Sequence, residues 1–308
     1  MKTKDKYIQA ICTIVVVFLM IGASELLNEK EIIFPEVTAL AVGMFLAPML
    51  PWKTSYSRMF ISITLCAILG VAIVLFIPAP LWVQMSLAYL AGQIVLILSR
   101  TSFAPMISAI VLPVMLQTKE SIYIVAAITL TLLIIAIKVI LDKTKIKTKE
   151  NYQKKEWRVK EEWISLIKRT IIVTILIFIA IKLNNRFVVA PPLLVAFTEL
   201  SNKKSKARDI PIKVIMTISL CALLGAVMRY LIVICGGWPL TLAAILAALG
   251  MIMIVMFMKV YMPPAGAMTI LAMLIPNESV VLYPVQVFVG ITIFVITAKL
   301  CFRKKDYH

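Results

Sequence analysis

The stretch VYMPPAGAMTILAML, residues 260–274, decides how the rest of the chain is interpreted. It is apolar enough to enter a lipid bilayer, yet it carries adjacent prolines at Pro263 and Pro264 and a glycine at Gly266. Proline removes a backbone donor and glycine weakens a helix, so the pattern needs a compensating reason. The composition of the chain and its repeated patterns supply that reason.

Composition indicates an integral membrane protein. Of the 308 residues, 62% are hydrophobic and only 15% are charged, which is far outside the range of soluble domains. Apolar runs recur along the whole chain, and the longer ones can cross a hydrocarbon core of about 30 Å as helices. The predicted fold class is therefore all-α, a polytopic membrane helical bundle.

We predict twelve membrane segments, at residues 8–27, 32–51, 58–78, 80–99, 102–117, 121–141, 169–183, 186–200, 210–235, 238–258, 260–276 and 279–301. The first run is expected to span the membrane rather than to be a cleaved signal peptide. Lysine and arginine, which give a formal net charge of +17, fall mainly in alternate connections. The positive-inside rule then predicts that both termini are cytoplasmic, in a membrane that we take to be a bacterial plasma membrane.

The basic linker 142–168 is expected to lie in the cytoplasm as well. In its second half Val159, Trp163, Leu166 and Ile167 fall at helical spacing among charges, a pattern compatible with an amphipathic helix on the membrane surface. Such a basic stretch can bind anionic lipid. The simpler interpretation is a solvated loop that obeys the topology rule.

Two sequence patterns occur twice in the chain. TLCAILG (64–70) returns as SLCALLG (219–225) at an offset of 219 − 64 = 155, and the run from Phe103 aligns with that from Tyr261 at 261 − 103 = 158. The stretches near Phe34 and Pro191 align less clearly, as proline-bearing starts of a second segment. We predict membrane repeat A at 1–141 and membrane repeat B at 169–308. With six segments each, the repeats share one orientation.

Segments 102–117 and 260–276 hold matching places in the two predicted repeats. Both are short and begin near proline, Pro105 in the first and Pro263 with Pro264 in the second. Paired short or broken segments indicate a transporter's binding site, and a helix that begins there directs a positive dipole end toward an anion. Ser108 and Gly266 are expected to face a shared cavity. The alternative is a packing motif without a ligand.

Three polar side chains within apolar segments complete the candidate substrate-binding set. Arg229 and Glu36 lie at similar distances from the outer ends of their segments and could pair, because an unpaired charge in lipid costs about 2.5 kcal/mol or more. The alternative is that Arg229 snorkels to the interface and Glu36 caps a helix start. Gln93 could line a polar path or join two helices by hydrogen bonds.

Other functional classes lack support in the sequence. Five cysteines show no metal-like spacing and the only histidine is His308, so neither a metal nor a cofactor is predicted. The chain carries no nucleophile–base pair or nucleotide motif, and we predict that it is not an enzyme. Its positive charge lies between apolar runs, which argues against a nucleic-acid partner. The expected partners are the lipid bilayer and a small-molecule solute, and an oligomer stays open.

At MPPAGAMTILAMLIP (262–276), taken with VAPPLLVAFTELSN and the repeated LCAILG-like pattern, the sequence resembles the HPP family of multi-pass membrane proteins. Pro263 and Pro264 match the two prolines of the family's His-Pro-Pro motif, and residues 265–267 match its small residues. Met262 stands in place of the histidine. Plant chloroplast members are described as nitrite transporters, so the resemblance implies transport. A looser resemblance to aromatic acid exporters of the fusaric-acid-resistance type lies in residues 58–70.

The leading hypothesis is a secondary transporter or channel for a small solute, expected to be an anion, with a pathway at the interface of the two repeats. The alternative is a membrane scaffold or assembly protein. In that case the basic linker recruits a partner or anionic lipid, and the bundle holds no pathway.

Labelling of single cysteines from one side of the membrane tests this topology. In a background without the native cysteines, we expect sites at Lys149 and Lys304 to react from the cytoplasm and a site at Asn184 to react from outside. An Asn184 site that labels from the same side as the other two would contradict the twelve-segment scheme.

Overall fold

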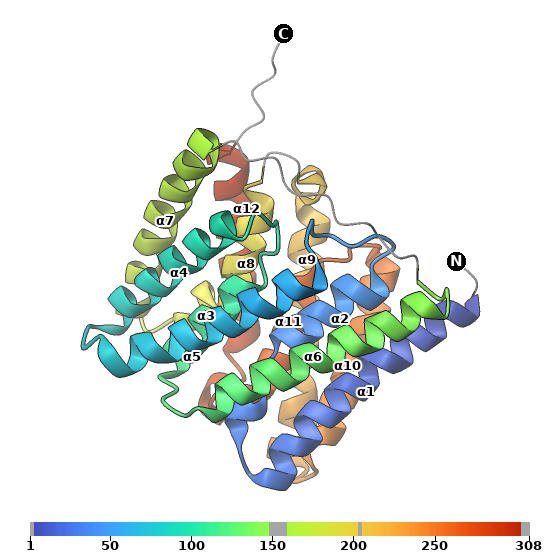
Figure 1. The fold of residues 1–308 in the computed structure, drawn as a ribbon. Helices are drawn as coiled ribbons and strands as arrows, with labels where there is room; N and C mark the ends of the chain where they lie inside the picture. The colour runs from blue at the N-terminus through green and yellow to red at the C-terminus, as the bar shows by residue number, and fades with distance from the viewer. Residues whose placement is uncertain (1–2, 148–158, 203–204, 303–308) are drawn as a thin grey trace.

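The computed structural model describes residues 3–147, 159–202 and 205–302, and all regular structure within these ranges is helical. Eight of the described helices are long and apolar enough to cross a membrane, as expected for an integral membrane protein. They are α1 (Thr3–Leu27), α3 (Tyr56–Phe76), α4 (Leu81–Leu98), α6 (Ile122–Lys143), α7 (Val159–Lys182), α9 (Pro211–Met228, continued by the π-helical η5, Arg229–Cys235), α10 (Leu240–Met258) and α12 (Tyr283–Cys301) (Figure 1).

Four expected membrane segments contain short helices, as expected for 102–117 and 260–276 but not for 32–51 and 186–200. Segments 32–51, 102–117, 186–200 and 260–276 hold α2 (Glu36–Ala41, continued by the π-helical η2, Val42–Leu46), α5 (Met106–Leu116), α8 (Pro191–Leu200) and α11 (Pro263–Leu274). Single 3-10 turns occur in the connections: η1 (Lys30–Ile32), η3 (Arg186–Val189), η4 (Lys206–Asp209) and η6 (Asn277–Ser279).

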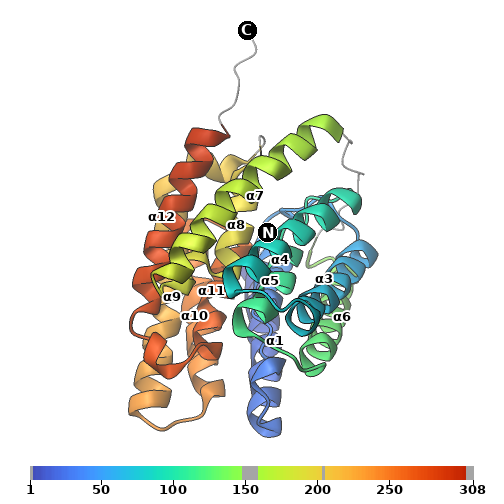
Figure 2. The same ribbon diagram turned by 90° about the vertical axis from the view of Figure 1, so that its left-hand side faces the viewer.

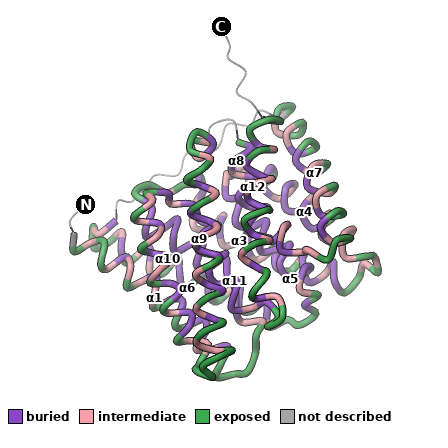
Figure 3. The backbone as a smooth tube through the Cα atoms, turned by 180° about the vertical axis from the view of Figure 1, so that it is seen from behind, coloured by how far each residue is buried: buried purple, intermediate pink, exposed green. Residues whose placement is uncertain are grey.

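The short helices form the centre of the bundle. Every residue of α2 and η2 is buried, and α5, α8 and α11 each have a single residue that is not fully buried. A helix that is apolar on all faces belongs in such a core. The long helices surround them, and exposed residues lie along the outer helices (Figure 3). The exposed large apolar side chains include Phe257 and Leu300.

The two sides of the helical bundle contact each other at the centre and at the periphery. Figure 2 shows α3 to α6 on one side of the molecule and α7 to α12 on the other. The two sides are joined at the centre, where α5 packs on α8 and α11 packs on α2. They are also joined at the periphery, where α4 packs on α7 and α1 packs on α10.

Proline sets where the short helices begin and, for two of them, where they end. Pro35 and Pro105 are the residues before α2 and α5, while α8 and α11 each begin with two prolines. Proline suits a first helical turn because its missing N–H group has no partner there in any case. Ala47 and Ile275 end α2–η2 and α11 in extended conformation just before Pro48 and Pro276, as expected for a residue that precedes proline.

Two glycines allow long helices to approach the short ones closely. A Cβ atom on Gly70 would lie 2.5 Å from the carbonyl oxygen of Ile110, and one on Gly225 would lie 2.2 Å from that of Thr269. These contacts join α3 to α5 and α9 to α11. They give a packing reason for the repeated pattern that ends at residues 70 and 225.

The second half of the predicted linker is part of a long helix. Residues 159–168 form the first turns of α7, which continues without a break to Lys182, so the expected amphipathic stretch is not a separate helix. The first residues of the chain, the linker residues 148–158 and the tail 303–308, for which the sequence predicts a cytoplasmic location, lie outside the described residues.

Alanine substitutions at the two glycines test this packing. Gly70→Ala and Gly225→Ala should each lower the free energy of unfolding by about 1 to 3 kcal/mol, because the added methyl group meets a backbone carbonyl that cannot move aside. The matched control is Gly22→Ala in α1, where the nearest atom to the new Cβ would be 3.9 Å away. Thermal unfolding in detergent measures all three, and equal stability of the three variants would contradict the packing argument.

Candidate functional site

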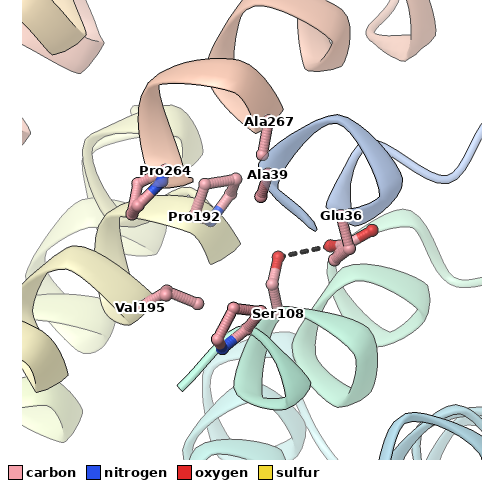
Figure 4. A pocket seen from close by; sticks show the side chains of 8 residues that line it. Glu36, Ala39, Ser108, Pro192, Val195, Pro264 and Ala267 are labelled. Carbon is pink, nitrogen blue, oxygen red and sulfur yellow. Dashed lines mark hydrogen bonds between the residues drawn. The ribbon is translucent and has the colours of Figure 1, made fainter. Parts of the chain in front are cut away.

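The first turns of the four short helices meet around one small cavity. Its volume is about 10 Å³, at the lower limit for a single water molecule. Each short helix contributes two side chains. The lining consists of Glu36 and Ala39, Pro105 and Ser108, Pro192 and Val195, and Pro264 and Ala267 (Figure 4).

The spacing of the lining residues explains how each helix reaches the cavity. In every pair the two residues are three positions apart, and residues at this spacing lie on the same face of a helix, one turn above the other. The first member of each pair stands at or next to the helix start. The first turns of all four helices therefore border the same place.

Only one pair of lining side chains is polar. The Ser108 hydroxyl donates a hydrogen bond to Oε1 of Glu36, which joins the starts of α5 and α2. Glu36 is 1% exposed, and its second carboxyl oxygen has no hydrogen-bond partner among the described residues. The other six lining side chains are proline, alanine or valine, so the cavity wall is otherwise apolar.

The helix starts provide a positive field with few free donors. The preceding carbonyls accept from the first-turn N–H groups, as in the bonds from Leu193 to Ala190 and from Ala265 to Met262. The paired prolines of α8 and α11 carry no N–H group at all. The dipole of each helix still places partial positive charge at its start. The site can therefore favour negative charge without forming a dense shell of hydrogen bonds.

The C-terminal ends of two short helices meet buried cations. Lys147 Nζ donates to the carbonyl oxygens of Phe45, at 2.9 Å, and Ala47 at the end of η2. Arg229 Nη1 donates to those of Ala272 at 2.6 Å and Ile275 at 2.5 Å at the end of α11. Cations stabilise the negative end of a helix dipole. These two short helices thus carry positive charge at their C-terminal ends, and no cation is among the cavity-lining residues.

The predicted pairing of Arg229 with Glu36 is wrong. Besides its bonds to α11, Arg229 donates from Nη2 to Oδ1 of Asn277 at 2.7 Å, whereas Glu36 binds Ser108. Arg229 is 5% exposed, so it does not snorkel to the surface either. It does not line the cavity and holds the end of α11 in place.

Gln93 also lies away from the cavity lining. Its Nε2 donates to Thr198 Oγ1 at 2.9 Å, and the Tyr89 hydroxyl lies 3.0 Å from the same oxygen. These bonds join α4 to α8, which is the structural alternative considered for this residue. The predicted polar path through Gln93 is not part of the cavity.

The alignment of the two proline-rich starts was one residue out of register. Pro105 and Ser108 line the cavity together with Pro264 and Ala267, which corresponds to an offset of 264 − 105 = 159 rather than 158. Gly266 faces α2 instead, because a Cβ atom on it would lie 2.8 Å from the carbonyl oxygen of Thr38. The expectation that Gly266 turns toward the cavity is therefore wrong, and Pro263 precedes the lining residue.

The residues that α2 and α8 contribute to the cavity lining were predicted only in part. Glu36 was a candidate, but Ala39, Pro192 and Val195 were missed. The signal was present in the adjacent prolines at 191–192, which repeat the pattern at 263–264, and in the alignment of the Phe34 and Pro191 stretches.

Removal of the Arg229 side chain tests its structural role. Arg229→Ala should lower the free energy of unfolding by about 1.5 to 3 kcal/mol, because it removes charged hydrogen bonds to buried carbonyls. The control is Arg186→Ala, whose guanidinium lies 5.1 Å from the Phe187 ring, and there we expect a loss of about 0.5 to 1 kcal/mol. Denaturant titration in detergent measures both, and an unchanged stability of Arg229→Ala would contradict the anchoring role.

Comparisons with protein-family models, curated proteins and solved structures found no match for this chain.

Proposed function

We propose that this protein is a secondary transporter for a small monovalent anion. The observation that carries the proposal is the meeting of four short-helix starts around one buried cavity. Discontinuous helices whose N-terminal ends point at a central site are typical of secondary transporters.

We further propose that the chain contains two repeats of six segments. The contacts between the halves support this: α5 on α8 corresponds to α11 on α2, and α4 on α7 corresponds to α10 on α1. Each of these four contacts between the halves has a counterpart in which the roles of the halves are exchanged, as a twofold axis between them requires. With six segments per repeat, that axis runs along the membrane normal.

Individual contacts support the same correspondence. The Tyr123 hydroxyl donates to the Ala109 carbonyl at 2.9 Å, and the Tyr283 hydroxyl donates to that of Met268 at 2.7 Å, with offsets of 283 − 123 = 160 and 268 − 109 = 159. The cavity pairs of α2 and α8 correspond at 192 − 36 = 156. Similar side chains therefore make similar contacts in both halves.

The short helices account for twelve segments if each covers half of a crossing. α5 has 11 residues and α11 has 12, so each is about 17 Å long, roughly half of the 30 Å hydrocarbon core. The connecting residues before each start, which include the 3-10 turns η1 and η3, would cover the other half. In the proposed arrangement α2 and α8 approach the centre from one side of the membrane, and α5 and α11 approach it from the other.

The substrate class follows from the charge and the apolar lining of the cavity. Four dipole starts favour negative charge, and no lysine or arginine is among the lining residues, so a single charge is easier to accommodate than several. Because the wall is largely apolar, a weakly hydrated ion loses less on entry than a strongly hydrated one. The resemblance to HPP proteins and a cytoplasmic location of both termini are compatible with this proposal and stay predictions.

Anion uptake into proteoliposomes tests the proposal, with a variant that narrows the cavity. Ala267→Val should reduce the initial uptake rate by about tenfold or more, which corresponds to at least about 1.4 kcal/mol in the barrier. The control is Ala244→Val in α10, which makes the same change at another fully buried alanine outside the cavity. We expect similar stability losses of about 1 to 3 kcal/mol in both variants, with uptake lost only in the first.

Equal uptake by the two variants would contradict a pathway through the cavity. If the wild-type protein moves no small anion, and vesicle binding depends only on the charge of linker 142–168, the scaffold hypothesis would replace transport.

A further inference from the structure

We propose that Glu36 carries the proton of a proton-coupled transport cycle, so that the anion and one proton cross the membrane together. This inference rests on the proposed transport function and adds the coupling ion to it. It is carried by the position of a single carboxyl group at the meeting point of the four helix starts.

Glu36 breaks the symmetry of the cavity. In the proposed correspondence Glu36 matches Pro192, Ala39 matches Val195, Pro105 matches Pro264, and Ser108 matches Ala267. The only two polar lining residues come from the same half of the chain and bind each other. The cavity therefore holds one ionisable side chain.

The surroundings of Glu36 do not neutralise a negative charge by an ion pair. The described ion pair of the chain joins Lys138 and Asp142, and the cations at the short-helix ends bind backbone carbonyls instead. The phenol of Tyr123 on α6 is a titratable neighbour of Glu36, and it donates its hydrogen bond to the Ala109 carbonyl instead of to the carboxylate. The lining residues from α5, α8 and α11 are serine, proline, valine and alanine, which bring no titratable group.

The carboxyl group has room for a proton at one oxygen. Ser108 donates to Oε1, whereas Oε2 is buried and has no hydrogen-bond partner in the described part of the chain. A proton on the carboxylate removes its negative charge. Proton binding thus removes the charge repulsion that an ionised Glu36 would exert on an anion in the cavity.

Like charges make the coupling obligatory. An ionised Glu36 already places one negative charge near the helix starts. It therefore repels an anion, and this repulsion is strong where water is excluded. The anion therefore enters when Glu36 is protonated. The proton that binds on one side of the membrane is released on the other side with the anion, so a monovalent anion moves without net charge.

The test uses the full-length protein in proteoliposomes and nitrate as the probe anion. When the outer solution is about one pH unit more acidic than the lumen, the protein should accumulate nitrate in the lumen up to about tenfold. A tenfold concentration ratio corresponds to about 1.4 kcal/mol. Glu36→Gln should abolish this accumulation, because the amide keeps the shape and can still accept from Ser108 but cannot take up a proton. Thermal unfolding in detergent checks that this variant is folded.

The matched control is Glu199→Gln. Glu199 is the other carboxyl on a central short helix, accepts a 2.8 Å hydrogen bond from Trp52 Nε1 and does not line the cavity. This variant should accumulate nitrate as the wild-type protein does. Two further measurements use the wild-type protein itself. A pH-sensitive dye inside the liposomes should report about one proton taken up per anion. A membrane potential imposed with a potassium gradient should not change the uptake rate.

The outcomes separate the two proposals. Accumulation by Glu36→Gln, or wild-type uptake that follows the potential and moves no proton, would overturn the coupling and leave anion transport standing. If the wild-type protein moves none of the small monovalent anions in either assay, the transport proposal fails and the coupling fails with it.

Discussion

The fold depends on how helix starts are satisfied where solvent does not reach them. Backbone polar groups without partners are costly in a membrane, and a helix that begins in the interior leaves N–H groups without carbonyls from a preceding turn. This chain meets the constraint with proline, which has no N–H group, and with tight turns to the preceding carbonyls, as at Leu193 and Ala190. These helix starts keep the partial positive charge of the helix dipole, and Glu36 lies next to them.

The remaining architecture supports these four starts. Gly70 and Gly225 let α3 and α9 press against the backbones of α5 and α11, while Lys147 and Arg229 hold the opposite ends of η2 and α11. The eight long helices enclose the short ones and present apolar side chains outward. Stability and the geometry of the cavity therefore rest on the same contacts.

The sequence was most informative where a residue type has one dominant structural effect, as proline has at the start of a helix. The proline pairs predicted helix starts, and composition predicted a helical membrane protein. Short helices were predicted in segments 102–117 and 260–276 but missed in 32–51 and 186–200, because π-helical and 3-10 turns extend the apolar runs beyond α2 and α8.

The facing of individual side chains was harder to predict. A shift of one residue moved Gly266 from the cavity to the seam with α2, since neighbouring residues on a helix point about 100° apart. Arg229 was assigned to a binding site because an isolated cation in an apolar run invites a charged partner. Its partners are three oxygens near the end of α11, and sequence alone gives no sign that backbone carbonyls would be placed there.

The unequal lining of the cavity bears on how such a chain could have arisen. If the two proposed repeats arose from one ancestral half that carried this glutamate, a pair of identical copies would have placed two glutamates in a space of about 10 Å³, where their negative charges would repel each other. Fusion of such halves into one chain would free the second copy to change, and a proline at position 192 would remove the conflict while keeping the helix start. After such a fusion, one half would keep the ionisable glutamate, while the other would carry a proline at the matching position.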